Sequence, residues 1–189
     1  MNNMSDREAV AIALENPIFF GHIVDRYQDK LARYIHRLGV RNPDDRDDVL
    51  QEIFVKVYRN LNGFDETLSF SAWIYRIAHN EAISWYRKRR VRPEGNLVQD
   101  GESLLEALAS DVTDTEVSFD QGLNADEVSK ALQEVPEKYR DVLILRFYEQ
   151  LSYEEIADVL KLPVGTVGTY VHRGKSALKD NLDTNKLHL

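Results

Sequence analysis

Apolar residues recur every third or fourth position through two long stretches of this chain, and no stretch alternates as a β-strand would. Helix starts are marked in the same stretches. Ser5 and Glu8 have the spacing of a capping box, and Asn16 and Asn42 each precede a proline suited to a first helical turn. The pattern predicts an all-α fold.

The two helical stretches are separated by an acidic segment. Ten acidic residues and no Lys or Arg lie between Glu94 and Glu127, among Gly, Ser and scattered apolar residues. This composition is typical of a flexible linker, because it offers too little apolar surface to bury. We therefore expect two small helical domains, residues 1–92 and 124–183, joined by an acidic linker at 93–123 and followed by a tail at 184–189.

Capping and proline signals place the individual helices. In the first domain we expect helices starting at Ser5, Asn16, Asn42 and about Ser71, the last running to Arg90. In the second domain we expect helices starting at Asn124, Pro136, Ser152 and about Val164.

The overall charge hides a basic remainder. The chain has a formal net charge of −8, but the acidic segment holds more negative charge than that, so the rest is mildly basic. There is no Cys, the five His are scattered, and no glycine-rich phosphate loop or nucleophile elbow is present. We therefore expect no metal, no cofactor and no catalytic residues.

The sequence carries no membrane signal. No apolar run approaches the roughly 18 to 20 residues of a membrane-spanning helix, and the first residues lack the pattern of a signal peptide. We expect a cytoplasmic protein without membrane insertion.

The last two expected helices have the spacing of a helix-turn-helix, with Lys161 to Pro163 as the turn. Val167, Val171 and Leu178 would face inward. Side chains of the kind that reach base edges or phosphates occupy other positions, namely Thr166, Thr169, Tyr170, His172, Arg173 and Lys175. An ordinary helical hairpin with a solvated basic face would show the same periodicity.

The helix expected at 71–90 carries aromatic, polar and basic residues on one side. The side is formed at three-to-four spacing by Trp73, Arg76, Asn80, Ser84 and Arg87, and the helix ends in Arg87, Lys88, Arg89 and Arg90. Cations, rings and amides together are what single-stranded nucleic acid requires. A structural alternative remains, since Trp85 is expected in the core and basic residues at a helix end compensate its dipole.

A side of opposite charge is expected on the helix after Asn42. Asp48, Gln51, Glu52 and Val55 would share a solvent-facing stripe that can dock a basic partner helix. Acidic residues nearer the helix start are explained by dipole compensation alone.

Together these motifs resemble the extracytoplasmic-function (group 4) sigma factors of bacterial RNA polymerase. The segment DDVLQEIFVKVYRNL is similar to the family's region 2.2, and FSAWIYRIAHNEAISWYRKRR to its regions 2.3 and 2.4. The segment that begins LQEVPEKYRDV and ends YVHRGKSAL is similar to region 4. The resemblance covers both expected domains and skips the linker.

The resemblance implies roles for these residues. Core RNA polymerase would be bound at its clamp helices by Asp48, Gln51, Glu52 and Phe54, and at its flap by region 4. Melted minus-10 promoter DNA would be held by Phe64, Trp73, Arg76, Asn80, Ser84, Arg87, Lys88 and Arg90. The minus-35 element would be read by Thr166, Thr169, Tyr170, His172, Arg173 and Lys175. In an off state such surfaces would be buried against one another or against an anti-sigma factor, and the acidic linker would thread toward the RNA exit path.

The last helix departs from the family pattern at three positions. Gly168 replaces a usual Lys, Tyr170 a usual Arg, and Gly174 a small helix-forming residue. Each interior glycine costs about 1 kcal/mol in helix propensity relative to Ala. We therefore expect a recognition helix that is less basic and less rigid, and a promoter element of unusual sequence.

Two other classes of protein fit parts of the sequence. A stand-alone helix-turn-helix transcription factor would make residues 1–92 a receiver or sensor, but they lack the strand and helix alternation of a receiver. An all-α interaction protein would bind neither DNA nor polymerase. The promoter-specificity subunit accounts for both domains, and such a subunit is not itself an enzyme.

Overall fold

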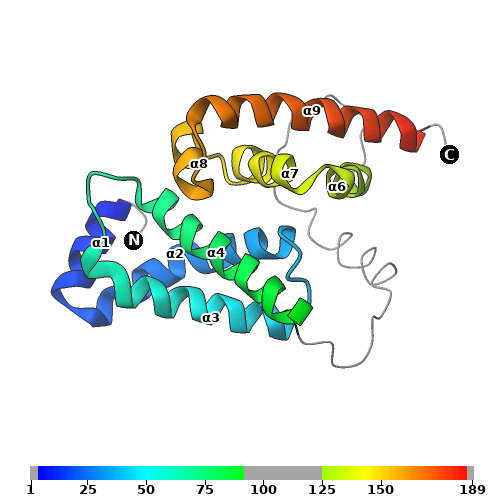
Figure 1. The fold of residues 1–189 in the computed structure, drawn as a ribbon. Helices are drawn as coiled ribbons and strands as arrows, with labels where there is room; N and C mark the ends of the chain where they lie inside the picture. Colours follow the sequence, from blue (N-terminus) through cyan, green and yellow to red (C-terminus); the bar gives the residue numbers. More distant parts are fainter. Residues whose placement is uncertain (1–3, 92–124, 187–189) are drawn as a thin grey trace. The chain divides into compact units, whose positions relative to one another are not determined.

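The structure is a computed structural model that describes residues 4–91 and 125–186. Every regular element in these two ranges is a helix, which confirms the all-α prediction there (Figure 1). The described residues form two compact units, centred on the N-terminal and on the C-terminal helices. The prediction of a flexible acidic linker at 93–123 lies outside the described residues. Within them, no helix combines the length and apolar character needed to cross a membrane.

The N-terminal unit follows the predicted helix starts closely. Its elements are α1 (Asp6–Glu15), the 3-10 turn η1 (Pro17–Phe20), α2 (Gly21–Arg37), α3 (Pro43–Asn60), the 3-10 turn η2 (Leu61–Gly63) and α4 (Phe70–Val91). The Ser5 and Glu8 capping box is present in full, and the Asn42 side chain accepts hydrogen bonds from the first backbone amides of α3. At Asn16 the prediction is wrong in detail. The Phe19 amide bonds the Asn16 carbonyl three residues back, so a 3-10 turn precedes α2.

Gly39 ends α2 as predicted, and the reason lies in its backbone. Its φ of 107° belongs to a conformation that side chains disfavour. The Val40 amide donates to the Ile35 carbonyl and the Gly39 amide to the His36 carbonyl, which is the Schellman pattern of helix termination. A Cβ at Gly39 would lie 1.8 Å from the Tyr86 hydroxyl, so the glycine also makes room for α4.

The core of the N-terminal unit is formed where α2, α3 and α4 pack together. α4 contributes small side chains, Ala72, Ala78 and Ala82, which are at most 2% exposed and let neighbouring helices approach closely. α1 is held to α2 by Asp6, which accepts from the Arg26 guanidinium and the Tyr27 hydroxyl, both at 2.6 Å. The burial of one side of α4 leaves its other side available for binding.

The described residues 125–186, which we call the C-terminal unit, contain five helical elements. They are α6 (Ala125–Glu134), α7 (Glu137–Leu143), the π-helical segment η3 (Ile144–Tyr148), α8 (Tyr153–Leu160) and α9 (Val164–Lys186). α6 and α7 both pack along α9 (Figure 1). The predicted start at Ser152 is correct, since Ser152 and Glu155 form a reciprocal capping box. The expected tail at 184–189 begins too early, because α9 continues to Lys186.

Gly174 allows the close approach of α9 to α7. A Cβ built there would lie 3.0 to 3.2 Å from three side-chain atoms of Leu143, which is itself only 2% exposed. At Gly168 a Cβ would meet Tyr153 at an ordinary 3.6 Å. From the sequence alone, both glycines are expected only to lower the helix propensity of α9. The structure gives Gly174 a packing role and Gly168 none.

The two glycines of α9 should therefore respond differently to the same substitution. We expect Gly168→Ala to raise the free energy of unfolding by about 1 kcal/mol, the helix-propensity gain. We expect Gly174→Ala to lower it by about 1 kcal/mol, because overpacking against Leu143 outweighs that gain. Thermal unfolding of the full chain by circular dichroism measures both. Equal stabilisation by the two variants would contradict the packing role of Gly174.

Asp141 on α7 is the one polar residue among the fully buried side chains that the structure describes, at 7% exposure. Burial raises the pKa of its carboxyl to about 7, with the Arg140 charge opposing the rise and the Glu137 charge adding to it. The folded chain thus holds this proton more tightly than the unfolded chain, whose carboxyl has an ordinary pKa near 3.8. The contribution of Asp141 to stability falls as the pH rises from that value to about 7.

Asp141→Asn removes this titration. The variant should be more stable than the parent, and its advantage should be larger at pH 8.5 than at pH 5.5 by about 2 kcal/mol, since each pH unit below the folded pKa is worth about 1.4 kcal/mol. Denaturant unfolding at the two pH values measures the difference. All other titrating groups are shared by the two proteins, so an advantage independent of pH would show that the carboxyl is ionised in the folded state.

Candidate nucleic-acid and polymerase interfaces

The outward side of α4 carries the polar residues predicted for single-stranded DNA. Asn80, Arg87 and Lys88 are exposed, and Ser84 and Arg76 are half-buried. No hydrogen bond or ion pair joins the side chains of Asn80, Arg87 or Lys88 to another described residue. These three side chains are therefore available to a ligand. The prediction for the Arg90 side chain lies outside the described side chains.

Trp73 is not exposed as the sequence interpretation placed it. Trp73 and Asn80 are two helical turns apart and so lie on the same side of α4, but the Trp73 side chain is only 8% exposed. Phe64 and Phe70 cover it, with ring centroids 5.2 and 5.5 Å from that of Trp73. The segment before α4 folds back over the first turn of the helix, a contact that helical periodicity cannot reveal. The accessible part of this side of α4 therefore begins beyond Trp73.

The segment that carries Phe64 is ordered by its own short-range hydrogen bonds. Asp65 accepts from the backbone amide and the hydroxyl of Thr67, at 2.9 and 2.7 Å. These bonds lower the pKa of the Asp65 carboxyl. Ser69 then caps α4 by accepting from the Ala72 amide. Phe64 is half-buried in this arrangement, so one part of its ring stays accessible.

The basic run at the end of α4 has two kinds of cation. The guanidinium of Arg89 lies 4.8 Å from the ring centroid of Trp85 and forms an ion pair with Asp45 of α3. Trp85 is half-buried beneath it, not in the core as predicted. Arg89 thus contributes to packing within the unit through contacts that the sequence did not predict, while Arg87 and Lys88 are free of described partners.

The acidic side predicted on α3 is exposed. Asp48, Gln51 and Glu52 are accessible to solvent, opposite the buried Val49, Ile53 and Val57. Phe54 lies beside them and is half-buried. Neither carboxylate forms an ion pair with a described cation. The side can therefore receive a basic partner.

The helix-turn-helix is built from α8 and α9 with Lys161 to Pro163 between them, as predicted. Lys161 has φ 54°, a left-handed conformation that non-glycine residues seldom adopt. The approach to α8 is held by Arg146, which donates to the Leu151 carbonyl at 2.8 Å and lies over the Tyr153 ring. These contacts hold the start of α8 against η3.

Four predicted base-reading residues share one side of α9. At 100° per residue, Thr166, Thr169, Tyr170 and Arg173 fall within about 100° of one another, while Val167, Val171 and Leu178 are buried. His172 is exposed at the edge of this side. Lys175 is on the far side of the buried stripe, where its amino group lies 5.5 Å from the centroid of the Phe147 ring.

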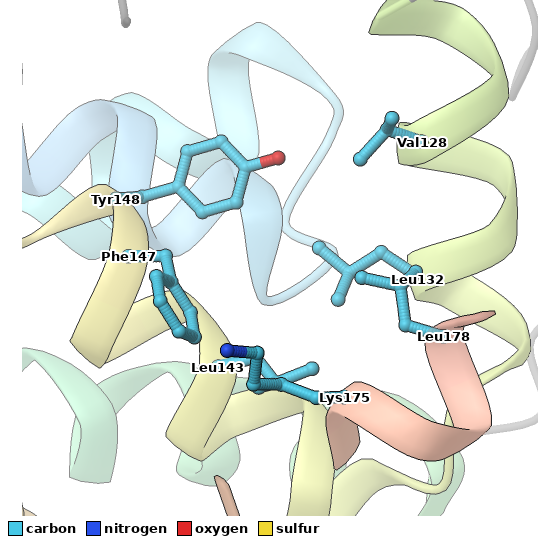
Figure 2. A pocket seen from close by; sticks show the side chains of 7 residues that line it. All are labelled: Val128, Leu132, Leu143, Phe147, Tyr148, Lys175 and Leu178. Carbon is cyan, nitrogen blue, oxygen red and sulfur yellow. The ribbon is translucent and has the colours of Figure 1, made fainter. Parts of the chain in front are cut away.

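Lys175 also lines a small apolar pocket between α6, η3 and α9 (Figure 2). The other lining side chains are Val128, Leu132, Leu143, Phe147, Tyr148 and Leu178. Figure 2 shows the aliphatic part of Lys175 beside Leu143, with its nitrogen directed toward Phe147. Lys175 thus contributes to a different surface of the unit from Tyr170 and Arg173.

The side of α9 formed by Thr166, Thr169, Tyr170 and Arg173 is called the recognition side below. Two residues of α7 that the sequence did not predict for this surface, Lys138 and Tyr139, lie beside it. The rings of Tyr139 and Tyr170 lie edge to face at a centroid distance of 5.1 Å, and Lys138 lies beside both rings. No local sequence signal marks this pair, because the contact joins residues about 30 positions apart. In residues 4–91 and 125–186, no group of three or more His, Asp or Glu side chains is placed to hold a metal ion.

Comparison with known proteins relates both units to one family. The family model of sigma-70 region 2 matches residues 23–92, and that of sigma-70 region 4 matches residues 125–178. The ECF RNA polymerase sigma factor SigW of Bacillus subtilis is 35% identical over 167 residues, which cover 86% of this chain and 88% of SigW. The ECF RNA polymerase sigma-E factor of Escherichia coli K12 is 34% identical over 86% of both chains.

Two solved structures have a similar fold. CnrH, solved in complex with the cytosolic domain of CnrY, matches with a TM-score of 0.70 and 28% identity over 95% of this chain and 97% of that one. The sigma factor RpoE of Bartonella quintana, solved with the anti-sigma factor NepR, matches with a TM-score of 0.63 over 87% and 96%. At 22% identity the second likeness concerns the fold alone.

The left-handed residue in the helix-turn-helix gives a prediction about stability. Lys161→Gly should raise the free energy of unfolding by about 0.5 to 1 kcal/mol, because glycine adopts positive φ without steric cost. Lys161→Ala is the matched control, since it removes the same side chain but keeps the backbone strain. Both Trp residues lie in the N-terminal unit, so circular dichroism is the suitable probe. A glycine variant no more stable than the alanine variant would refute the prediction.

Proposed function

The chain belongs to the extracytoplasmic-function sigma factors of the sigma-70 family, which bind RNA polymerase and direct transcription initiation, and on that premise we propose how its residues divide this task. Residues 1–92 act as region 2, which docks on polymerase and holds the melted minus-10 strand. Residues 124–183 act as region 4, which reads the minus-35 element. The acidic segment at 93–123 connects them. The chain is a specificity subunit and not an enzyme.

The outward side of α4 carries the minus-10 part of the proposal. Asn80 offers an amide to a base edge, and Arg87 and Lys88 offer uncommitted charges to phosphates. The half-buried ring of Phe64 lies at the start of the same side and offers a surface for stacking. Single-stranded DNA can use all three kinds of contact, whereas duplex DNA hides its base faces. Trp73 supports Phe64 from beneath and does not itself contact a base.

The acidic side of α3 supports the polymerase part of the proposal. Asp48, Gln51 and Glu52 are exposed and uncommitted, and Phe54 adds an apolar contact beside them. A basic helical surface such as the polymerase clamp would complement them. The apolar pocket of the C-terminal unit offers a second contact, for the flap (Figure 2).

The minus-35 part of the proposal rests on α9, whose recognition side is formed by Thr166, Thr169, Tyr170 and Arg173. A helix-turn-helix presents such a side to the major groove. The reading of residues 1–92 as a receiver does not hold, since residues 23–92 match sigma-70 region 2. We further propose an anti-sigma partner, by analogy with CnrH, which was solved in complex with the cytosolic domain of CnrY. We also propose a cytoplasmic location, because a sigma factor acts where core polymerase and promoter DNA are found.

Run-off transcription with purified core polymerase tests the proposal. Over a pool of genomic promoter fragments, addition of the protein should produce transcripts that start at defined sites. Asn80→Ala combined with Arg87→Ala should lower their yield at least tenfold, because one base contact and one phosphate contact are lost. A template with a preformed bubble at the start site should recover part of the yield, since melting is then already complete.

Arg33→Ala is the matched control for this experiment. Arg33 is an exposed cation of α2 without a described partner, so its loss changes the net charge of the unit equally. Its transcript yield should equal that of the parent. Full activity of the double variant on duplex promoters would remove α4 from the proposed minus-10 surface, and absence of any new transcript would refute the proposal as a whole.

A further inference from the structure

Four side chains from α7 and α9 form a compact surface cluster in the C-terminal unit, which we call the α7–α9 cluster: Lys138, Tyr139, Tyr170 and Arg173. Lys138 and Arg173 are exposed, and the two tyrosines are half-buried. The amino nitrogen of Lys138 lies 4.9 Å from the ring centroid of Tyr139 and 5.9 Å from that of Tyr170. The two rings meet edge to face at 5.1 Å. The Arg173 guanidinium points to the Tyr139 hydroxyl at 3.5 Å. Two cations therefore flank one pair of rings.

The cluster is positively charged and has no described counter-ion. Neither Lys138 nor Arg173 forms an ion pair with a described carboxylate. The Arg173 hydrogen bond lowers the pKa of the Tyr139 phenol, and the same contact raises the pKa of Arg173. Both shifts arise because the contact favours the charged form of each group: the cationic guanidinium stabilises a phenolate, and the phenol oxygen stabilises the guanidinium. An anionic ligand would find both cations unneutralised.

The recognition side of α9 is itself poor in charge. Of Thr166, Thr169, Tyr170 and Arg173, only Arg173 is a cation. Gly168 has no side chain to contribute, and Lys175 lies across the buried stripe, over Phe147. Phosphate contacts supply most of the affinity of a protein for duplex DNA. A recognition side with a single cation needs a further one from elsewhere.

We propose that Lys138 of α7 supplies this cation by contacting a phosphate of the minus-35 duplex, and that Tyr139 positions Arg173 for the same DNA. The proposal rests on the proposed function of α9. The Tyr170 ring lies beside Lys138, at 5.9 Å from its amino nitrogen. A basic side chain at position 170, such as the Arg usual in the family, would repel Lys138 from this place. The phosphate-binding surface thus extends from the recognition helix onto the helix packed against it.

Tyr139 has a defined part in this arrangement. Its hydroxyl accepts from Arg173, and its ring packs against Tyr170. The side chain of Arg173 is long and exposed, so without this contact it would sample many conformers before binding. Tyr139 is therefore a positioning residue, and Lys138 is the one that contacts DNA.

Fluorescence anisotropy of the full chain measures the contact. The probes are two labelled duplexes of equal length, one holding the upstream element of a promoter recovered by run-off transcription and one with that element scrambled. Lys138→Ala should weaken binding of both duplexes by about tenfold at low salt. It should also reduce the slope of log affinity against log salt by about one, the signature of one lost phosphate contact.

Two matched variants separate charge at this place from charge in general. Lys130→Ala removes an exposed cation from α6 in the same unit and should leave the salt slope unchanged. Lys138→Arg keeps the charge and should retain most of the affinity. Circular dichroism of each variant confirms that the helices are intact.

The role of Tyr139 is tested by a double-mutant cycle. Tyr139→Phe keeps the ring and removes only the hydroxyl, so it should weaken binding in the parent but not in the Arg173→Ala background. A purely structural effect of Tyr139 would weaken binding equally in both backgrounds and would overturn its positioning role.

The outcomes distinguish this proposal from the proposed function. If the parent prefers the promoter duplex but Lys138→Ala keeps its affinity and salt slope, Lys138 does not contact DNA and α9 acts alone. If the parent binds neither duplex in the presence or absence of core polymerase, upstream recognition by this unit is refuted together with the role of Lys138.

Discussion

The rotation of each binding helix about its own axis is set by the side chains that it buries, and every proposed site in this protein depends on that rotation. α4 buries Ala72, Ala78 and Ala82 against its neighbours, which turns Asn80 and Arg87 outward. α9 buries Val167, Val171 and Gly174, and the close contact of Gly174 with Leu143 fixes its distance from α7. Small residues at these positions allow close helix packing, and close packing fixes which polar side chains of the same helix face outward.

Charge is organised locally in this protein, and its net value of −8 says little about binding. Some cations make contacts within the folded unit. Arg89 is paired with Asp45 and lies over the Trp85 ring, and Arg146 donates a hydrogen bond to the Leu151 carbonyl just before α8. Others, such as Arg87 and Lys138, have no described counter-ion. Acidic residues likewise divide into those that hold helices together and those left exposed on α3. The proposed binding surfaces lie where charged side chains have no described partner.

Much of the fold could be predicted because helix signals are local. Capping boxes at Ser5 and Ser152, the cap at Asn42 and the turn at Lys161 to Pro163 all act within a few residues, and all occur where the sequence placed them. The site was predicted less completely, because exposure depends on what packs from elsewhere. Trp73 has the periodicity of the outward side of α4 but is covered by Phe64 and Phe70. Lys175 was grouped with Arg173 but lies across the buried stripe.

The sequence by itself determined the helical class, the helix starts and the motifs of the sigma factor family, since each is a pattern of neighbouring residues. Only the tertiary structure decided which side chains of those helices are free to bind. It placed Lys138 and Tyr139 beside Tyr170 and Arg173, and it gave Gly174 a packing role in place of a simple loss of helix propensity. The physical reason is the same in each case: a contact between distant residues depends on how two helices pack, and periodicity along one helix holds no information about its partner.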